Sequence, residues 1–238
     1  MDETPLDEHK NINADDTARD EILFSREEFK KVKEALHIYG WAQKILLSKL
    51  QILSEALDSL TEDSLTEANP IEHMKWRVKN PIRIARKLHR LGHDVTAQSM
   101  RENLTDIVGF RIICAFSQDI KTIVDMLKTM PDTKIIREKD YITNPKPSGY
   151  RSYHLIIEIP VYYLGTTEIV PVEIQLRTSA MDFWATLEHK VQYTHQGLMP
   201  RELREALAAC ADQIADLDNR MFVIHDIVNL IEKKELYF

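Results

Sequence analysis

The sequence has few cysteines, no long apolar run and no excess of basic residues. Its two cysteines are Cys114 and Cys210, and the pattern favours two buried free thiols in a reducing compartment over a disulfide. No apolar run approaches the roughly 20 residues that a membrane helix needs. The acidic start, MDETPLDEHKNINADD, lacks the apolar core of a signal peptide. Because the net charge is -7, broad binding of nucleic acids is disfavoured. We expect a cytoplasmic protein that binds neither membranes nor DNA.

The sequence also lacks the glycine-rich motifs that hold phosphates in many nucleotide enzymes. Neither a P-loop nor a GxGxxG motif occurs, so phosphates would have to be bound by side chains. Basic side chains are concentrated between Lys75 and Arg90, where seven Lys and Arg residues occur without an acid. One predicted helical face carries Lys79, Arg83, Arg86, Lys87 and Arg90. A solvated face is the simpler explanation, but the unrelieved repulsion favours a local anion site.

The chain divides into four parts by its pattern. Residues 1–20 are acidic and polar, which predicts disorder. Residues 21–68 carry apolar side chains at helical spacing, in one long helix or in two helices broken at Gly40. Residues 69–195 alternate between strand and helix patterns, and residues 196–238 form a last long helix.

The central part predicts an α+β fold with a mixed sheet of four or five strands. Helix starts are predicted at Asn69-Pro70 and at Asn80-Pro81, the second helix ending near Leu91. The remaining predicted helices cover 118–130 and 180–193, and the predicted strands cover 107–116, 133–142, 152–164 and 167–178, with Gly165 at the turn of a hairpin.

Polar residues on the predicted strands suggest a binding cleft. Glu173, Gln175 and Arg177 share one face of a strand because side chains alternate between faces. Asp106 precedes a strand, and Arg111 interrupts an apolar run where a guanidinium needs a partner. Taken singly, these residues have ordinary explanations as an exposed strand and a turn. Together with the basic segment, they predict a nucleotide-binding transferase that depends on Mg²⁺, which binds carboxylates and phosphates.

Four segments resemble the synthetase domain of the RelA/SpoT family: RVK (77–79), DIVGFR (106–111), REKDYITNPKPSGYRSYH (137–154) and VEIQLRT (172–178). The segment MDFWATLEHKVQY (181–193) is similar to the stand-alone members, the small alarmone synthetases. The resemblance implies a nucleotidyltransferase-like mixed sheet flanked by helices. It also implies a GTP pyrophosphokinase of the stringent response, which transfers the β,γ-pyrophosphate of ATP to the 3′-hydroxyl of GTP or GDP. The products would be pppGpp or ppGpp and AMP.

The resemblance implies roles for the acids and for the residues that bind ATP. Asp106 would be a Mg²⁺ ligand, and Glu173 would be a second ligand or the base for the 3′-hydroxyl. The implied adenine contacts are Arg77 and Arg111, and the implied phosphate ligands are Lys79, Arg86 and Lys87.

The resemblance likewise implies an acceptor site for GTP or GDP. Tyr150 would stack on guanine. The other implied acceptor contacts are Lys139, Lys146, Ser148, His154, Gln175 and Arg177. Ser148 departs from the asparagine that the family's loop often has, and the roles of Gln175 and Arg177 are not separated.

Alternative functions remain open. A toxin-type relative would pyrophosphorylate the 3′ end of tRNA or adenine nucleotides, and the net charge weighs mildly against tRNA. A catalytically dead nucleotide sensor is a further alternative, against which the two carboxylates weigh. The dipeptides His93-Asp94 and His225-Asp226 are too isolated to indicate the hydrolase domain of the long family members.

The last helix carries a narrow apolar seam from Leu203 to Ile231, which needs another helix as its partner. The resemblance implies a homotetramer formed through terminal helices. Pairing within one chain, with the helical part between Phe29 and Leu60, is the alternative.

Overall fold

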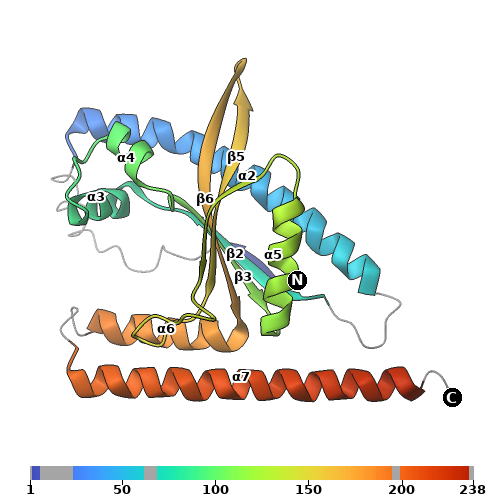
Figure 1. Cartoon of the computed structure of the whole chain (residues 1–238). Coiled ribbons are helices and arrows are strands. Elements are labelled where there is room, and N and C mark those ends of the chain that lie inside the picture. The colour runs from blue at the N-terminus through green and yellow to red at the C-terminus, as the bar shows by residue number, and fades with distance from the viewer. Residues whose placement is uncertain (1, 6–23, 62–68, 195–198, 236–238) are drawn as a thin grey trace.

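A mixed sheet forms the centre of the computed structural model, which describes residues 2–5, 24–61, 69–194 and 199–235 (Figure 1). Its strands are β1 (Asp2–Pro5), β2 (Ile71–Val78), β3 (Val108–Cys114), β4 (Lys134–Asp140), β5 (Tyr153–Tyr163) and β6 (Thr166–Thr178). The helices are α2 (Arg26–Thr61), α3 (Pro81–Arg90), α4 (Ala97–Asn103), α5 (Ser117–Thr129), α6 (Ser179–Thr194) and α7 (Arg201–Glu235). The predicted α+β fold with long terminal helices is confirmed.

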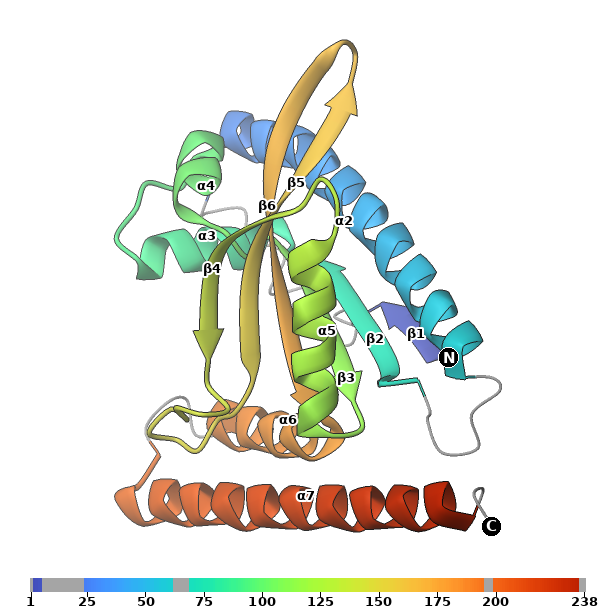
Figure 2. The ribbon, with the colours of Figure 1, turned by 45° about the vertical axis from the view of Figure 1, so that its right-hand side comes forward.

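The strand order is β1-β2-β3-β6-β5-β4. Strand β3 runs parallel to β6, and both lie inside the sheet, as their apolar patterns predict. Strands β5 and β6 form the predicted antiparallel hairpin, which extends beyond the rest of the sheet (Figure 2). The pairing of β3 with β6 therefore brings two segments that are far apart in the sequence into direct register.

The two faces of the sheet differ in character. On one face, Phe110, Ile174 and Leu155 are aligned across β3, β6 and β5, and all three are buried. They belong to one apolar core with side chains from α2 and α5, including Leu46 and Ile123. The opposite face carries the polar residues of the same strands, so the helices of the core leave that face available for a site.

Two Asn-Pro pairs precede different structures. Asn80 caps α3 as predicted, because its side-chain oxygen accepts a hydrogen bond from the backbone nitrogen of Arg83 at 2.9 Å. The helix predicted at Asn69-Pro70 is wrong, since strand β2 follows it. Asn69 instead accepts from the backbone nitrogen of Ile71 at 2.9 Å and donates to Ser54 of α2. Its hydrogen bonds therefore tie the start of β2 to α2.

Other predictions for the N-terminal part need correction. Helix α2 is continuous through Gly40, so of the two alternatives the single long helix is right and the break at Gly40 is wrong. The disorder predicted for residues 1–20 is wrong for Asp2–Pro5, which pairs with β2 as a parallel edge strand. The other residues of that predicted segment lie outside the described residues. Helix α4 was not predicted, although Thr96 caps it through the backbone nitrogen of Ser99.

Helix α7 lies along α6, on the other side of the molecule from α2 (Figure 1). The indole nitrogen of Trp184 on α6 donates to the carbonyl of Leu207 on α7 at 3.1 Å. Pairing of the last helix with the first within one chain, the alternative to subunit contacts, is therefore not formed by the described residues. Cys114 is buried as predicted, but Cys210 on α7 is exposed. Within the described residues, no helix is long and apolar enough to cross a membrane.

Candidate active site

The polar face of the sheet brings the predicted site residues into rows. Arg77, Gly109 and Glu173 are aligned across β2, β3 and β6. The neighbouring row runs across five strands and contains Lys75, Arg111, Gln175, His154 and Lys139. A Cβ added at Gly109 would meet no atom within 4 Å. There is therefore room above β3 beside Glu173, of the kind that a ligand can fill.

Asp106 lies just before β3 and binds two lysines. Its Oδ2 atom is 2.8 Å from Nζ of Lys79, which follows β2, and 2.5 Å from Nζ of Lys87 on α3. A backbone hydrogen bond of 2.7 Å from Lys79 to the carbonyl of Ile107 fixes this approach. Burial raises the pKa of Asp106, but the two ammonium groups outweigh it and leave the pKa below its usual value. Burial lowers the pKa of Lys79 more than Asp106 raises it.

The Asp106 carboxylate also fits the predicted metal ligand. Its Oδ1 atom is buried, and no described residue offers it a hydrogen bond. Within the described residues, no group of three His, Cys, Asp or Glu side chains could hold a metal by itself. Mg²⁺ commonly binds through one or two carboxylates plus substrate phosphates. The donor set is therefore suited to a metal that arrives with a nucleotide.

Glu173 lies between the lysine pair and the aromatic side of the face. Its Oε1 atom is 3.4 Å from Nδ1 of His154, and its Oε2 atom accepts from the Gln175 amide at 2.9 Å. Burial raises the pKa of Glu173, but the contact with His154 outweighs it, so the pKa is lowered. The charge of Asp106 also acts on Glu173. The two predicted acids therefore belong to one electrostatic site.

Arg177 is the most enclosed charged group of the site, with 4% of its surface exposed. Its guanidinium donates to the hydroxyl of Tyr150 at 2.6 Å, to Gln175 at 3.1 Å and to Asp182 at 2.9 Å. The Tyr150 hydroxyl in turn lies 2.8 Å from Nε2 of His154. Hydrogen bonds therefore run from Arg177 through Tyr150 to His154, and the other ring nitrogen of His154 faces Glu173.

Asp182 is a site residue to which the sequence reasoning gave no role. It lies at the start of α6 and binds both Arg177 and Arg111, whose Nη1 atom is 3.1 Å from its Oδ1. Burial, followed by the nearby Arg177, lowers the pKa of Arg111. The Nε atom of Arg111 is buried and has no hydrogen-bond partner among the described residues. Arg111 is therefore held in place while one donor is left for a ligand.

The loop between β4 and β5 gathers aromatic and basic groups. The Nζ atom of Lys146 lies 4.8 Å from the ring centre of Tyr141 and 4.7 Å from that of Tyr150. Tyr141 also meets the His154 ring edge to face, and it is a second residue missed by the sequence reasoning. These rings and the ammonium group form a surface suited to a base and its phosphates.

Three more predicted site residues lie on the surface or beside another cavity. Arg86 is exposed on α3, next to Lys87, and Lys139 is exposed on β4 opposite His154. Ser148 lines a different cavity, of about 420 Å³, between the loop and the start of α7. Their predicted roles stay predictions, as do those of the other predicted site residues.

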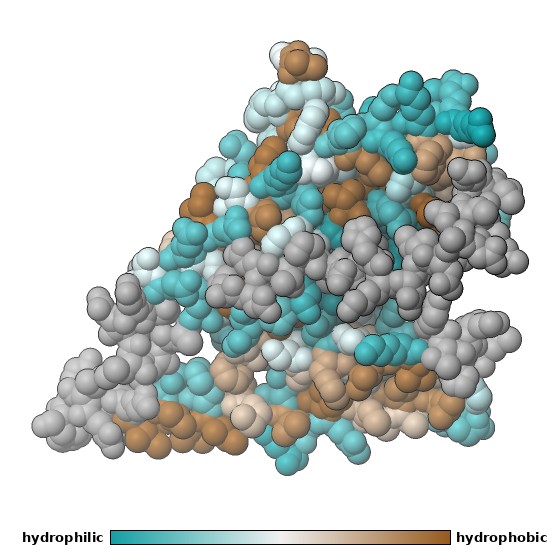
Figure 3. Space-filling view, turned by 180° about the vertical axis from the view of Figure 1, so that it is seen from behind, coloured by the Kyte–Doolittle hydropathy of each residue, from teal (hydrophilic) through white to brown (hydrophobic). Residues whose placement is uncertain are grey.

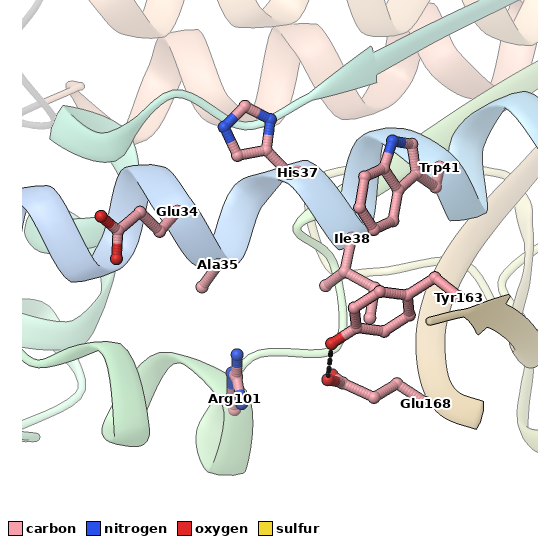
Figure 4. A pocket seen from close by; sticks show the side chains of 8 residues that line it. All are labelled: Glu34, Ala35, His37, Ile38, Trp41, Arg101, Tyr163 and Glu168. Carbon is pink, nitrogen blue, oxygen red and sulfur yellow. Dashed lines mark hydrogen bonds between the residues drawn. The ribbon is translucent and has the colours of Figure 1, made fainter. Parts of the chain in front are cut away.

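A further pocket of about 400 Å³ lies between α2, α4 and the β5–β6 hairpin (Figure 4). Trp41 and Tyr163 form one wall, and the Tyr163 hydroxyl donates to Glu168 at 2.6 Å. None of the predicted site residues lines this pocket.

Comparison with known proteins agrees with the resemblance. The family described as "Region found in RelA / SpoT proteins" matches residues 76–198. The chain belongs to this family. Its sequence is 44% identical over 192 residues to the GTP pyrophosphokinase YwaC of Bacillus subtilis, a match that spans 81% of this chain and 89% of that protein.

Solved RelA/SpoT-family structures share the fold. The small alarmone synthetase 2 of Bacillus subtilis superposes with a TM-score of 0.72 at 42% identity, covering 82% of this chain and 97% of that chain. The small alarmone synthetase 1 of the same species, bound to its product pppGpp, superposes with a TM-score of 0.69 at 33% identity, covering 78% and 94%. The stand-alone type of family member predicted from the sequence is therefore confirmed.

The lowered pKa of Asp106 predicts a pH-dependent contribution to stability. A carboxylate with a depressed folded pKa stabilises the fold above its unfolded pKa, about 3.9, and loses this effect as the pH falls through the folded value. Asp106→Asn should lower the free energy of unfolding at pH 7 by on the order of 1–3 kcal/mol, between surface and buried ion pairs. The difference from the unchanged protein should disappear well below pH 4.

Urea unfolding at a fixed protein concentration, at pH 7 and at pH 3, measures this effect. Asp125→Asn, at an exposed acid of α5, is the matched control. Its free energy of unfolding should equal that of the unchanged protein at both pH values. An Asp106→Asn deficit that is the same at both pH values would contradict the assignment of the effect to ionised Asp106.

Proposed function

We propose that this chain is a GTP pyrophosphokinase, which transfers the β,γ-pyrophosphate of ATP to the 3′-hydroxyl of GTP or GDP. The observation that carries the proposal is the placement of Glu173 between two unlike binding surfaces. On one side, Asp106 lies with Lys79 and Lys87. On the other side, His154 leads to the ring of Tyr150. The relative YwaC, a GTP pyrophosphokinase, supports the same reaction.

The lysine side suits the donor. The phosphates of ATP are anions that can bind the ammonium groups of Lys79 and Lys87 in place of Asp106. Arg86 is exposed on the same helix as Lys87. The buried Nε atom of Arg111 has no partner among the described residues, beside the ion pair with Asp182. Arg77 on β2 is paired with Gly109 on β3, next to the open space above that glycine. A planar guanidinium stacks well on an aromatic base, which supports adenine between these two arginines.

The aromatic side suits the acceptor. The Tyr150 ring, flanked by Lys146, can stack on guanine, and the ammonium group can bind a phosphate. A structure of a related small alarmone synthetase contains pppGpp, which supports a guanine nucleotide on this side. GTP and GDP share the base and the ribose, so both are proposed as acceptors. ATP and GTP are cytoplasmic nucleotides, so we expect the enzyme to work in the cytoplasm.

Glu173 is placed to act on the acceptor hydroxyl. Its lowered pKa keeps it ionised at neutral pH, so it can accept the proton of the 3′-hydroxyl while His154 and Gln175 orient it. Asp106 and Glu173 would hold Mg²⁺, which supplies positive charge for the transferred pyrophosphoryl group. Lys79, Lys87 and Arg111 provide further positive charge that is already positioned before the reaction.

The reaction is tested directly by its products. The purified protein is incubated with Mg²⁺, ATP labelled at the γ-phosphate, and GTP, GDP or tRNA, and the products are separated by chromatography. We expect labelled pppGpp or ppGpp together with AMP. Label found only in tRNA or in an adenine nucleotide would favour the toxin-type alternative, and no transfer in any arm would favour a sensor.

The two acids should both be essential for turnover. Asp106→Asn and Glu173→Gln should each lower kcat by at least about 10²-fold, the scale of losing one preorganised electrostatic group. Glu168→Gln is the matched control, because Glu168 lies on the same strand but lines the pocket of Figure 4. Steady-state kinetics with circular dichroism separates this loss from unfolding, and full activity of either acid variant would refute its role.

Donor and acceptor contacts should separate in the KM values. Tyr150→Ala should raise the KM for GTP or GDP, because stacking of a base on an aromatic side chain contributes roughly 1–3 kcal/mol. Arg111→Ala should raise the KM for ATP instead. Tyr150→Phe keeps the ring and removes the hydroxyl bound to Arg177, so it tests stacking apart from the hydrogen bonds. If Tyr150→Ala changes only the KM for ATP, the two sides are wrongly assigned.

We also propose that the half of α7 from Leu217 onward binds further copies of this chain, giving the homotetramer that the family resemblance implies. Apolar side chains of this half are exposed along one edge of the molecule (Figure 3), including Leu217, Met221, Ile224, Val228 and Ile231. The first part of the predicted seam of α7 therefore packs against α6, and the rest is exposed. An exposed seam of this regularity is suited to another helix.

Leu217→Glu should yield smaller oligomers that stay folded, because the charge would be buried without a partner in the interface. Size-exclusion chromatography with light scattering measures the mass. Asn219→Glu adds the same charge at an exposed polar position of α7 and should leave the mass unchanged. A monomeric unchanged protein at micromolar concentration would rule out this role for α7.

A further inference from the structure

The first half of α7 contacts the loop that carries Tyr150. Arg151 follows Tyr150 directly, and its guanidinium reaches α7. Its Nη1 atom donates to the carbonyls of Gly149 and Ala211, each at 3.3 Å, and its Nη2 atom donates to Asp212 at 2.9 Å. One side chain therefore joins the loop backbone to the helix backbone over 60 residues of sequence.

Gly149 allows the loop to lie this close to α7. Its φ of +89° is in the region that favours glycine. A Cβ at this position would overlap the Cβ of Ala211 and would lie 3.3 Å from the Cα of Ala208. Inside the loop, the backbone nitrogen of Gly149 donates to the carbonyl of Lys146 at 2.8 Å. The turn that carries Lys146 is therefore closed against the helix.

The ring of Tyr150 is held by the same helix. It packs against a small cluster formed by Trp184 and Ala211, together with Leu207 and Ile214 of α7. This cluster is separate from the main core of the sheet. The position of the Tyr150 ring therefore depends on α7 as well as on its hydroxyl bonds to Arg177 and His154.

We infer that Arg151 is a positioning residue for the acceptor nucleotide, because it clamps the Lys146–Tyr150 loop onto α7 and thereby sets the plane of the Tyr150 ring. The inference rests on the proposed acceptor role of Tyr150. Asp212 contributes less than Arg151, because its side chain is 73% exposed and exposed ion pairs are weak. The guanidinium, with the Arg151 side chain only 18% exposed, also serves two carbonyl groups that Asp212 does not.

Kinetics of charge-removing variants test the clamp. Arg151→Met should raise the KM for GTP or GDP about tenfold, the scale of losing hydrogen bonds from a charged group. The KM for ATP should change less than about twofold, because no contact of Arg151 with a described residue lies on the donor side. Asp212→Asn should raise the acceptor KM only about two- to threefold. Asp216→Asn is the matched control, because Asp216 pairs with Arg220 on α7 itself.

Hydrogen exchange tests the clamp without an acceptor. In Arg151→Met, the backbone amides of Lys146, Ser148, Gly149 and Tyr150 should exchange faster, whereas those of β3 and β6 should not. Unchanged exchange of the loop would overturn the clamp, and faster exchange with an unchanged acceptor KM would overturn its positioning role. If the unchanged protein turns over no guanine nucleotide, the proposed function fails, whereas the exchange measurement still decides the clamp.

A second pair of variants tests the contact at Gly149 independently of charge. Gly149→Ala should raise the acceptor KM and loop exchange as Arg151→Met does, because the added methyl group must move the loop away from Ala211. Adding Ala211→Gly to the Gly149→Ala variant removes the Cβ that the new methyl group would overlap. The double variant should therefore recover part of the acceptor binding and of the slow loop exchange. A Gly149→Ala protein with unchanged loop exchange and acceptor KM would contradict the inference.

Discussion

Two arginines on the polar face of the sheet share one carboxylate, that of Asp182. Arg177 and Arg111 lie 2.9 and 3.1 Å from the same oxygen atom. A guanidinium as enclosed as that of Arg177 is costly without partners, so the fold of this region requires Asp182 at the start of α6. Because Arg177 holds Tyr150 and Arg111 faces the donor side, one ion-paired group links both halves of the proposed active site.

Charge on this face is balanced locally rather than over the whole chain. The net charge is -7, yet the segment before α3 and the helix itself are basic. The sequence suggested that no acid relieves the repulsion in that segment, but Asp106 from another part of the chain binds two of its lysines. The anion site is therefore already partly neutralised, and a nucleotide must compete with an internal carboxylate for these lysines.

The sequence was informative where local pattern decides structure. The apolar runs of β3, β5 and β6 and the alternation of Glu173 with Ile174 predicted both the central strands and the shared polar face. Strand β2 was missed because Asn69-Pro70 has the composition of a helix start, whereas its side-chain bonds to α2 are tertiary. An acid in the first turn of a helix, such as Asp182, is usually explained by the helix dipole, so its role was invisible without the fold.

The alternation along β6 ties the site and the core to one another. Glu173, Gln175 and Arg177 face the nucleotides in our proposal, while Val172, Ile174 and Leu176 between them are buried among the core helices. Insertion or deletion of one residue in this strand would exchange the two sets at once, placing charges in the core and leucine in the site. A change of chain length near the site would therefore preserve the sheet only in a loop, and the β4–β5 loop is where a different acceptor specificity could arise without rebuilding the sheet.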